Sequence, residues 1–276
     1  MTFTMYALSS ADGTALHATW WEPEGTPKGV ICRVHGVGEH SGRHEHVAER
    51  LTAAGYAVGM FDLRGHGRSA GTRGHTPLND TLDDIDAMLA DIGSRAPDAP
   101  TFLFGHSLGG LVVLLYALRR DADLAGVVAS APALRSPVLE QTLKIEAAKL
   151  LGRLVPWVQI PTALDDSGLS RDQAVIDAYR ADPFVHDKAS LRLGKDAAEG
   201  AQWVLQHAGE MRTPLLLIHG SADPIVYPSG TEEFARSAPG DVTLKIYQGL
   251  LHEPHNEPEQ EEVLNDLVAW LDAHSG

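Results

Sequence analysis

The pentapeptide Gly-His-Ser-Leu-Gly at positions 105–109 places Ser107 in a setting that could make it a nucleophile. A serine hydroxyl attacks only when a base removes its proton and hydrogen-bond donors stabilise the oxyanion that forms. The apolar run 101–105 predicts a strand ending just before Ser107, and the run 108–120 predicts a helix beginning just after it. Such a sharp turn exposes the serine hydroxyl, and flanking glycines suit its crowded backbone. We therefore predict Ser107 to be the nucleophile of an acyl-transfer reaction.

A second pentapeptide of the same form, Gly-Arg-Ser-Ala-Gly at 67–71, is centred on Ser69. Several polar residues separate it from the preceding apolar run at 56–62, and the polar segment after it does not have the pattern of a helix. The strand-to-helix context that exposes a nucleophile is therefore missing. We predict Ser69 to be a loop residue without a catalytic role.

A base for Ser107 and a carboxylate that orients the base are expected further along the chain, each just after a strand. Asp223 follows the apolar run 214–220, and His252 follows the run 243–248. In this arrangement the histidine removes the serine proton and later protonates the leaving group, while the aspartate fixes the imidazole tautomer. The sequence thus predicts Ser107, Asp223 and His252 as the catalytic residues, with activity falling at acid pH as His252 becomes protonated.

Two backbone amides should stabilise the oxyanion. One belongs to Leu108, the residue after the nucleophile, and the other to the loop after the first central strand. That loop is the run His-Gly-Val-Gly at 35–38, in which Val37 is the expected donor. We expect the side chain of His35 to brace the loop.

The 14 histidines of the chain raise the question of a metal site. His40, His44 and His46 lie close together in sequence, and the run His-Glu-Pro-His at 252–255 superficially resembles a zinc-binding helix. That motif needs two residues between the glutamate and the second histidine, so that both ligands share one helix face. Here Pro254 alone intervenes. We predict no metal ion and no cofactor.

The elements that must position these residues alternate between short apolar strands and amphipathic helices, which predicts a mostly parallel α/β sheet with helices on both faces. A turn signal at Asp12-Gly13 predicts a hairpin between the first two strands. The expected strands are 2–9, 16–22, 29–34, 56–62, 101–105, 126–130, 214–220 and 243–248. The expected helices of this core are 45–54, 78–95, 108–120 and 258–274.

The segment 131–213 is far longer than the roughly 30 residues that a simple crossover between parallel strands needs. Amphipathic patterns predict helices at 138–155 and 174–180, the second preceded by a capping box of Ser170 and Gln173. An all-helical insertion of this kind is typical of a cap over an active site. We expect a core formed by 1–132 and 210–276, and an inserted helical cap at 133–209, as one structural unit.

Composition narrows the classes of partner. The formal net charge is −15, from 22 basic and 37 acidic residues, which argues against nucleic acid and anionic membrane surfaces. Cys32 is the only cysteine, so no internal disulfide can form. The N-terminus lacks the pattern of a signal peptide, and the longest apolar stretch, 110–118, is too short to span a membrane. We expect a soluble, cytoplasmic protein.

These motifs together resemble the monoacylglycerol lipases of the lysophospholipase-like and serine-aminopeptidase-type α/β-hydrolases. The resemblance extends over nearly the whole chain. Besides the Ser107 motif, it is carried by 35–43, 62–69, 170–171 with 179–183, and 247–253. It implies an α/β-hydrolase fold with a helical cap, and a small acyl-ester substrate whose acyl chain runs under the cap.

The resemblance also implies an activity and a substrate pocket. The expected reaction is cleavage of monoacylglycerols to fatty acid and glycerol. The positions that match the family's glycerol pocket are Glu39, Arg43, His106, Tyr179 and His255.

Other functions stay open at this point. The enzyme could be a broader carboxylesterase or lysophospholipase, or a proline-type aminopeptidase in which Asp165 and Asp166 bind a free amino terminus. A degenerate hydrolase acting as a receptor is a third possibility. Transient membrane contact would involve apolar cap residues at 151–158, including Trp157.

Overall fold

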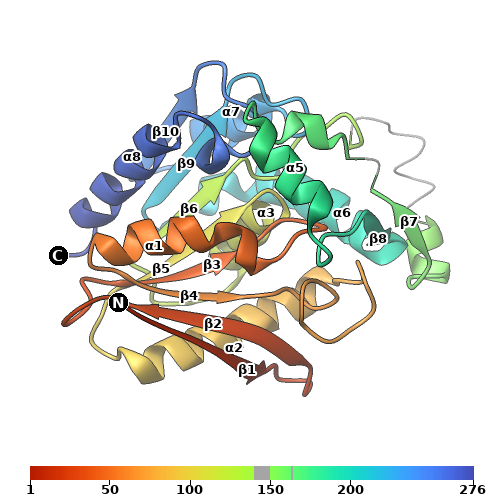
Figure 1. Cartoon of the computed structure of the whole chain (residues 1–276). Coiled ribbons are helices and arrows are strands. Elements are labelled where there is room, and N and C mark those ends of the chain that lie inside the picture. Colours follow the sequence, from red (N-terminus) through yellow and green to blue (C-terminus); the bar gives the residue numbers. More distant parts are fainter. Residues whose placement is uncertain (140–149, 163) are drawn as a thin grey trace.

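The computed structural model describes residues 1–139, 150–162 and 164–276 (Figure 1). Within them, a mixed sheet of eight strands has the order β1-β2-β4-β3-β5-β6-β9-β10. Strands β1 and β2 run antiparallel to their neighbours, and the others are parallel. The strands are β1 Thr2–Ser9, β2 Ala15–Glu22, β3 Val30–Val34, β4 Ala57–Phe61, β5 Thr101–His106, β6 Gly126–Ser130, β9 Leu215–Gly220 and β10 Val242–Tyr247. All eight predicted strands are confirmed, within one or two residues at their ends.

Helices cover both faces of the sheet and bury an apolar cluster on each. One face carries α2 (Leu78–Arg95), α3 (Leu108–Arg119), α6 (Leu191–His207) and α7 (Pro228–Ser237). The other carries α1 (Glu45–Ala53) and α8 (Gln260–Ala273). The predicted helices of the core are confirmed, whereas α6 and α7 were not predicted.

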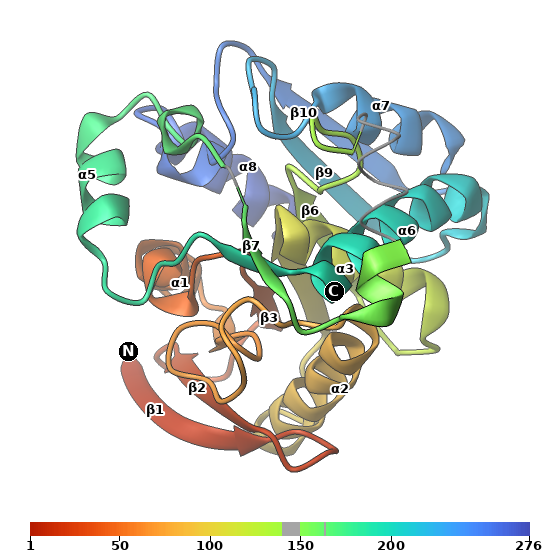
Figure 2. The same cartoon turned by 90° about the vertical axis from the view of Figure 1, so that its right-hand side faces the viewer.

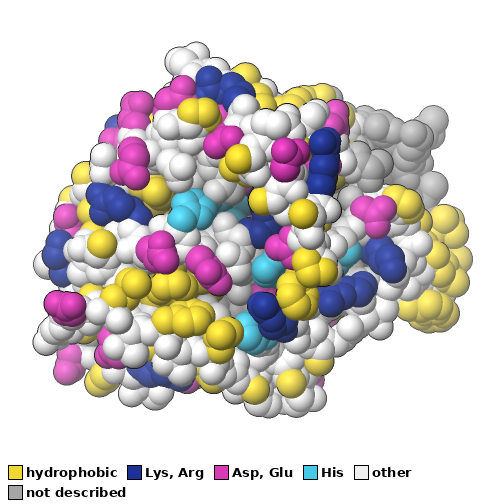
Figure 3. All heavy atoms as spheres, viewed as in Figure 1, with side chains coloured by type: hydrophobic (Ala, Val, Ile, Leu, Met, Phe, Trp, Pro, Cys, Tyr) yellow, Lys and Arg dark blue, Asp and Glu magenta, His cyan; other side chains and the backbone are white. Residues whose placement is uncertain are grey.

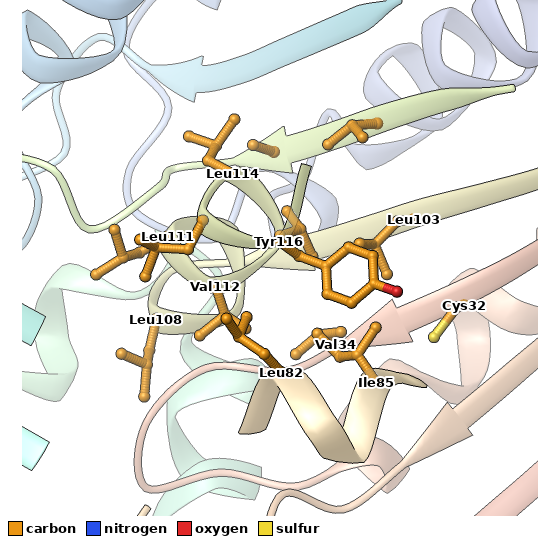
Figure 4. Close-up of a cluster of buried hydrophobic side chains, with 14 of the residues drawn as sticks. Cys32, Val34, Leu82, Ile85, Leu103, Leu108, Leu111, Val112, Leu114 and Tyr116 are labelled. Atoms are coloured by element: carbon orange, nitrogen blue, oxygen red, sulfur yellow. The ribbon is translucent and has the colours of Figure 1, made fainter. Parts of the chain in front are cut away.

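Helix α3 fixes the position of the predicted nucleophile. Its side chains from Leu108 to Tyr116 are all buried, because the helix is enclosed by the sheet, α2 and α6. A helix that is apolar on every side belongs in such an interior. Figure 4 shows Val112 and Tyr116 of α3 facing Val34 of β3 and Ile85 of α2. Because α3 begins directly after Ser107, this packing holds the turn on a rigid base.

The secondary structure of the inserted segment differs from the prediction. It is not all-helical, since β7 (Gln159–Pro161) pairs antiparallel with β8 (Lys188–Ser190). These strands are short and have no apolar alternation. The predicted helix 138–155 lies largely outside the described residues, although 150–154 are helical.

The predicted capping box is also wrong. Helix α5 (Gln173–Ala181) is capped by Asp172, whose carboxylate accepts a hydrogen bond of 2.9 Å from the Ala174 N–H. The Ser170 hydroxyl instead donates to the Asn256 carbonyl at 2.8 Å. Ser170 is thereby used to join the insertion to the core.

Helix α6 lies within the predicted cap segment but beside α3 of the core (Figure 2). Its buried residues Leu193, Ala201 and Val204 belong to the same apolar cluster as α2 and α3. We propose that the cap ends near residue 190 and that α6 is part of the core layer.

Candidate active site

The backbone at Ser107 has φ 55° and ψ −116°, in the left-handed region that side chains rarely adopt. The two flanking glycines are required by close packing. A Cβ on Gly105 would lie 2.1 Å from the Gly109 carbonyl oxygen, and one on Gly109 would lie 2.3 Å from the Val34 carbonyl oxygen. The Gly-x-Ser-x-Gly spacing is therefore a steric requirement of the turn between β5 and α3.

The three predicted catalytic residues meet at the carboxyl ends of β5, β9 and β10. His252 Nε2 lies 2.9 Å from Ser107 Oγ, and His252 Nδ1 lies 2.7 Å from Asp223 Oδ2. Because an ionised carboxylate only accepts hydrogen bonds, the proton of a neutral His252 is assigned to Nδ1. Nε2 is then free to accept the proton of the Ser107 hydroxyl. This is the geometry of a general base acting on a serine nucleophile.

Burial and charge set the ionisation of this pair in opposite directions. Burial by itself would lower the pKa of His252, but the Asp223 carboxylate outweighs it and the pKa lies above its ordinary value. Burial would likewise raise the pKa of Asp223, yet His252 and the hydrogen bonds to the carboxylate hold that pKa well below its usual range. Asp223 therefore stays ionised, and its charge favours the protonated form of His252.

Sequence reasoning missed a second histidine on the same carboxylate. His219, at the end of β9, lies with Nε2 3.0 Å from both Asp223 Oδ2 and the Val226 carbonyl oxygen. Since both neighbours are acceptors, Nε2 carries a proton and donates. The other ring nitrogen of His219, Nδ1, lies 2.7 Å from Thr231 Oγ, so that Thr231, His219, Asp223 and His252 form one hydrogen-bonded series. The only available signal was a polar residue ending an otherwise apolar strand.

The loop after β3 carries the Val37 amide, the second expected oxyanion donor. Neither the Val37 nor the Leu108 amide donates a hydrogen bond to another described residue. The imidazole of His35 donates from Nδ1 to the Gly36 carbonyl at 2.7 Å and accepts from the Leu63 N–H at 2.9 Å. Because a carbonyl and the next N–H share one peptide plane, fixing the Gly36 carbonyl also fixes the direction of the Val37 N–H. His35 thus braces the loop, as expected.

A pocket opens beside Ser107, and Ser107 and His252 are part of its lining. One part of its wall is apolar, with Val37, Leu164 and Leu169. The other part is polar and consists of Glu39, Arg43, His106, Tyr179 and Glu253. Four of the five positions that match the family's glycerol pocket are therefore on the wall.

The polar groups of this wall differ in their freedom to bind a ligand. Arg43 bridges two carboxylates, 2.6 Å from Glu39 and 2.7 and 2.9 Å from Glu253. Its guanidinium also lies 4.7 Å from the ring centre of Tyr179. In contrast, no described residue forms a hydrogen bond with the Tyr179 hydroxyl or with Nε2 of His106 (its Nδ1 lies 3.3 Å from Ser130 Oγ). Tyr179 and His106 are thus the side chains with unused hydrogen-bonding capacity toward the pocket.

His255 is not on the pocket wall, and this expectation is corrected. It is 2% exposed, its ring packs against His106 and His44, and its nitrogens have no hydrogen-bond partner among the described residues. Burial holds its pKa well below the ordinary value, so the ring is neutral. Its ring instead packs against that of His106, with 4.8 Å between the ring centres.

Glu253 was missed as a pocket residue, although it directly follows His252. In addition, the insertion holds this loop through backbone hydrogen bonds from His252 N–H to Gly168 and from Glu253 N–H to Leu169, of 3.2 and 2.8 Å. In the described part of the chain, no group of three or more histidine, cysteine or acidic side chains has a geometry that could hold a metal ion.

Comparisons with known proteins agree with this geometry. Residues 25–259 match the family model described as serine aminopeptidase, S33. The chain is 36% identical to a monoacylglycerol lipase of Mycolicibacterium smegmatis, over 98% of this chain and 97% of that protein. It is 35% identical to an uncharacterized abhydrolase domain-containing protein of Dictyostelium discoideum, of which it spans only 29% of the length.

A solved structure of a related protein has the same fold. The crystal structure of the Paleococcus ferrophilus monoacylglycerol lipase superimposes with a TM-score of 0.85 at 36% identity. The match covers 99% of this chain and all of that one. The chain therefore belongs to the monoacylglycerol lipase-like α/β-hydrolases, a family of serine hydrolases that cleave carboxylic esters.

Proposed function

We propose that the protein hydrolyses monoacylglycerols to fatty acid and glycerol through an acyl-enzyme. Ser107 Oγ attacks the ester carbonyl while His252 accepts its proton, and the resulting oxyanion accepts hydrogen bonds from the Val37 and Leu108 amides. Collapse of this intermediate breaks the bond to the glycerol oxygen, which takes the proton from His252. Water, activated by the same base, then releases the fatty acid and restores Ser107.

The observation that carries the proposal is the divided wall of the pocket beside Ser107. The free hydroxyl of Tyr179 and Nε2 of His106 can hydrogen-bond glycerol hydroxyls, while Leu164 and Leu169 offer apolar contact to the first acyl carbons. Glu39 and Arg43 support this wall mainly by holding each other. The 36% identity to monoacylglycerol lipases over nearly full length supports the same substrate class.

The test is a panel of glycerol monoesters of rising chain length, assayed beside di- and triacylglycerols and lysophosphatidylcholine. We expect kcat/KM for monoacylglycerols to exceed that for diacylglycerols at least about tenfold, because a second acyl chain leaves the glycerol hydroxyls unable to make their hydrogen bonds. Equal rates on all glycerides would instead indicate a general carboxylesterase. A preference for lysophosphatidylcholine would indicate a lysophospholipase.

The alternative of a proline-type aminopeptidase finds no support in the pocket. Asp166 pairs with Arg180 at 2.6 Å, and Asp165 is an exposed residue that accepts hydrogen bonds from Ser167. Neither aspartate lines the pocket. The carboxylates of Glu39 and Glu253 on the wall are both ion-paired with Arg43. We expect no turnover of aminoacyl-proline amides in the same assay.

We also propose that an apolar surface of the cap reaches lipid aggregates. This surface, which we call the cap patch, consists of Leu150, Leu151, Leu154, Trp157, Val158 and Ile160, all exposed. In Figure 3 apolar side chains gather at the edge where β7 lies in Figure 1. Contiguous exposed apolar surface is unusual on a monomer and marks an interaction site. None of the described helices has the length and apolar character needed to cross a bilayer.

Replacing Trp157 by serine tests the cap patch. Trp157 is 65% exposed, and burying an aromatic side chain of this size in a lipid interface stabilises binding by about 2 kcal/mol. We expect flotation with zwitterionic vesicles to fall at least about tenfold, with hydrolysis of a soluble short-chain ester unchanged. Met5→Ser, at a 58% exposed methionine of β1, is the matched control. Unchanged flotation of the Trp157→Ser variant would contradict the proposal.

A further inference from the structure

A buried arginine stands in the middle of the central sheet without an obvious function. Arg33 belongs to β3, is 1% exposed, and lies 4.1 Å from the ring centre of Phe104 on the neighbouring strand. Its Nε and Nη1 atoms have no hydrogen-bond partner among the described residues. Burying a guanidinium is unfavourable when two of its three nitrogens lack hydrogen-bond partners. The charge of Arg33 is therefore retained at a loss of stability. A group held under such conditions invites a functional explanation.

The one hydrogen bond that this guanidinium makes with a described residue leads toward the active site. Arg33 Nη2 donates to Nδ1 of His44 at 2.7 Å. His44 is fully buried, and burial together with the charge of Arg33 lowers its pKa to about 3. Its ring is therefore neutral, and since Nδ1 accepts from Arg33, the proton must be on Nε2. Arg33 thus selects the tautomer of His44.

The proton on His44 Nε2 faces Glu39. The two atoms Nε2 and Oε2 of Glu39 are 3.1 Å apart, although the approach is too bent for an ideal hydrogen bond. The other oxygen of Glu39 accepts from the Gly36 N–H at 2.6 Å. Gly36 immediately precedes the oxyanion donor Val37. Arg33, His44, Glu39 and the loop therefore form one continuous chain of contacts.

We propose that Arg33 and His44 are positioning residues of the oxyanion hole, acting through Glu39 on the loop that carries the Val37 amide. In this chain each residue orients the next, and the last contact fixes the Gly36 N–H. His35 fixes the carbonyl of the same residue from the other side. With both peptide groups of Gly36 held, the Val37 N–H is preorganised before the substrate arrives.

The positive charge of Arg33 has a second role in this proposal, which is to balance the carboxylates near Ser107. A Cβ built on Gly36 would lie 2.9 Å from Glu39 Oε1 and 3.1 Å from Ser107 Cβ, so this carboxylate is close to the nucleophile. An uncompensated negative charge at that point would oppose the oxyanion. Arg33 and Arg43 balance the charges of Glu39 and Glu253. Removing Arg33 would leave the group with a net charge of −1.

The variants that test the proposal are Arg33→Met, His44→Phe and His44→Gln. Methionine fills the buried space without charge, and phenylalanine keeps the ring but removes both nitrogens of His44. Glutamine retains one acceptor for Arg33 and one donor for Glu39, so it serves as the matched control for His44→Phe. The inference rests on serine-ester chemistry but not on the glycerol headgroup. The substrate is therefore p-nitrophenyl butyrate, and activity of the wild-type protein on this ester must be shown first.

We expect Arg33→Met and His44→Phe to lower kcat about tenfold with KM within about twofold. This is less than the 10²–10³-fold loss on removing an oxyanion donor itself, because the donor is displaced but present. The affinity for a trifluoromethyl ketone, which forms an oxyanion adduct with the serine, should weaken by the same factor. His44→Gln should recover most of both values. The Tm of Arg33→Met should stay the same or rise, because a poorly satisfied buried charge is removed.

The opposite pattern defeats the proposal. If Arg33→Met and His44→Phe lower the Tm while the folded protein keeps the wild-type kcat and trifluoromethyl ketone affinity, then both residues serve the fold alone. If Arg33→Met does not fold, the comparison of His44→Phe with His44→Gln decides by the same two readouts. A wild-type protein that does not cleave the p-nitrophenyl ester would contradict the ester-hydrolase assignment, which is a distinguishable failure.

Discussion

Replacing Ser107 by alanine is expected to lower kcat for ester hydrolysis about 10⁶-fold, as loss of the nucleophile does in other serine hydrolases. This corresponds to about 8 kcal/mol of transition-state stabilisation. The loss is large because Ser107, His252 and Asp223 act as one unit, joined by contacts of 2.9 and 2.7 Å. The remaining rate would come from the oxyanion amides and from binding alone. Steady-state kinetics on a soluble short-chain ester measure the effect.

The second Gly-x-Ser-x-Gly pentapeptide supplies the matched control, Ser69→Ala. The Ser69 hydroxyl accepts from the His17 N–H at 2.9 Å and donates to the Asp62 carbonyl at 2.5 Å, and Ser69 does not line the pocket beside Ser107. This variant should keep its kcat and lose about 1–3 kcal/mol of unfolding free energy, because buried partners are left unsatisfied.

Labelling with a fluorophosphonate gives an independent readout for the Ser107 assignment. Ser107→Ala should take up no label, and Ser69→Ala should be labelled as the wild type is. A loss of only tenfold in kcat for Ser107→Ala would refute the assignment. No label on Ser107 in the wild-type protein would favour a receptor without catalytic activity.

The sequence predicted the sheet and the grouping of Ser107, Asp223 and His252 because both depend on local pattern and order along the chain. The parallel strands are mostly apolar runs, and all of them except the edge strand β10 are buried on both faces. Ser107, Asp223 and His252 each follow such a run, and parallel strands bring their carboxyl ends to one edge. The short strands β7 and β8 have no such signal, because their pairing depends on contacts between distant segments.

The pocket was less predictable, since side chains from distant segments decide it. The pairing of Glu39 with Arg43 has helix-like i,i+4 spacing, yet the second carboxylate on Arg43 comes from Glu253, 210 residues away. His255 matches the motif, but the turn after His252 directs its ring behind His106. Likewise, the sequence shows Arg33 only as a polar residue within an apolar strand. Its contact with His44 depends on the fold.

Replacing Asp223 by asparagine is expected to lower kcat/KM about 10⁴-fold, as the same exchange does in another serine hydrolase. The hydrogen bonds of Asp223 explain how. Its Oδ1 accepts the N–H groups of Ile225 and Val226 at 2.8 and 3.0 Å, so the amide oxygen of asparagine would stay there. The NH₂ group then takes the place of Oδ2 and donates to His252 Nδ1. The proton of His252 moves to Nε2, which can no longer accept the proton of Ser107.

The pH dependence provides a second measurement on the same variant. In the wild type, kcat/KM should fall as pH drops through the pKa of His252, which Asp223 holds above its ordinary value near 6.5. Without the carboxylate, the residual activity of Asp223→Asn should retain this acid limb but at lower pH. Asp241→Asn is the matched control, because Asp241 contacts His274 at 3.0 Å on the surface. A wild-type acid limb below pH 6, or an Asp223→Asn variant with more than a tenth of the wild-type rate, would contradict the role of Asp223. The two measurements therefore separate the orienting effect of the carboxylate, seen in the rate, from its electrostatic effect, seen in the pKa.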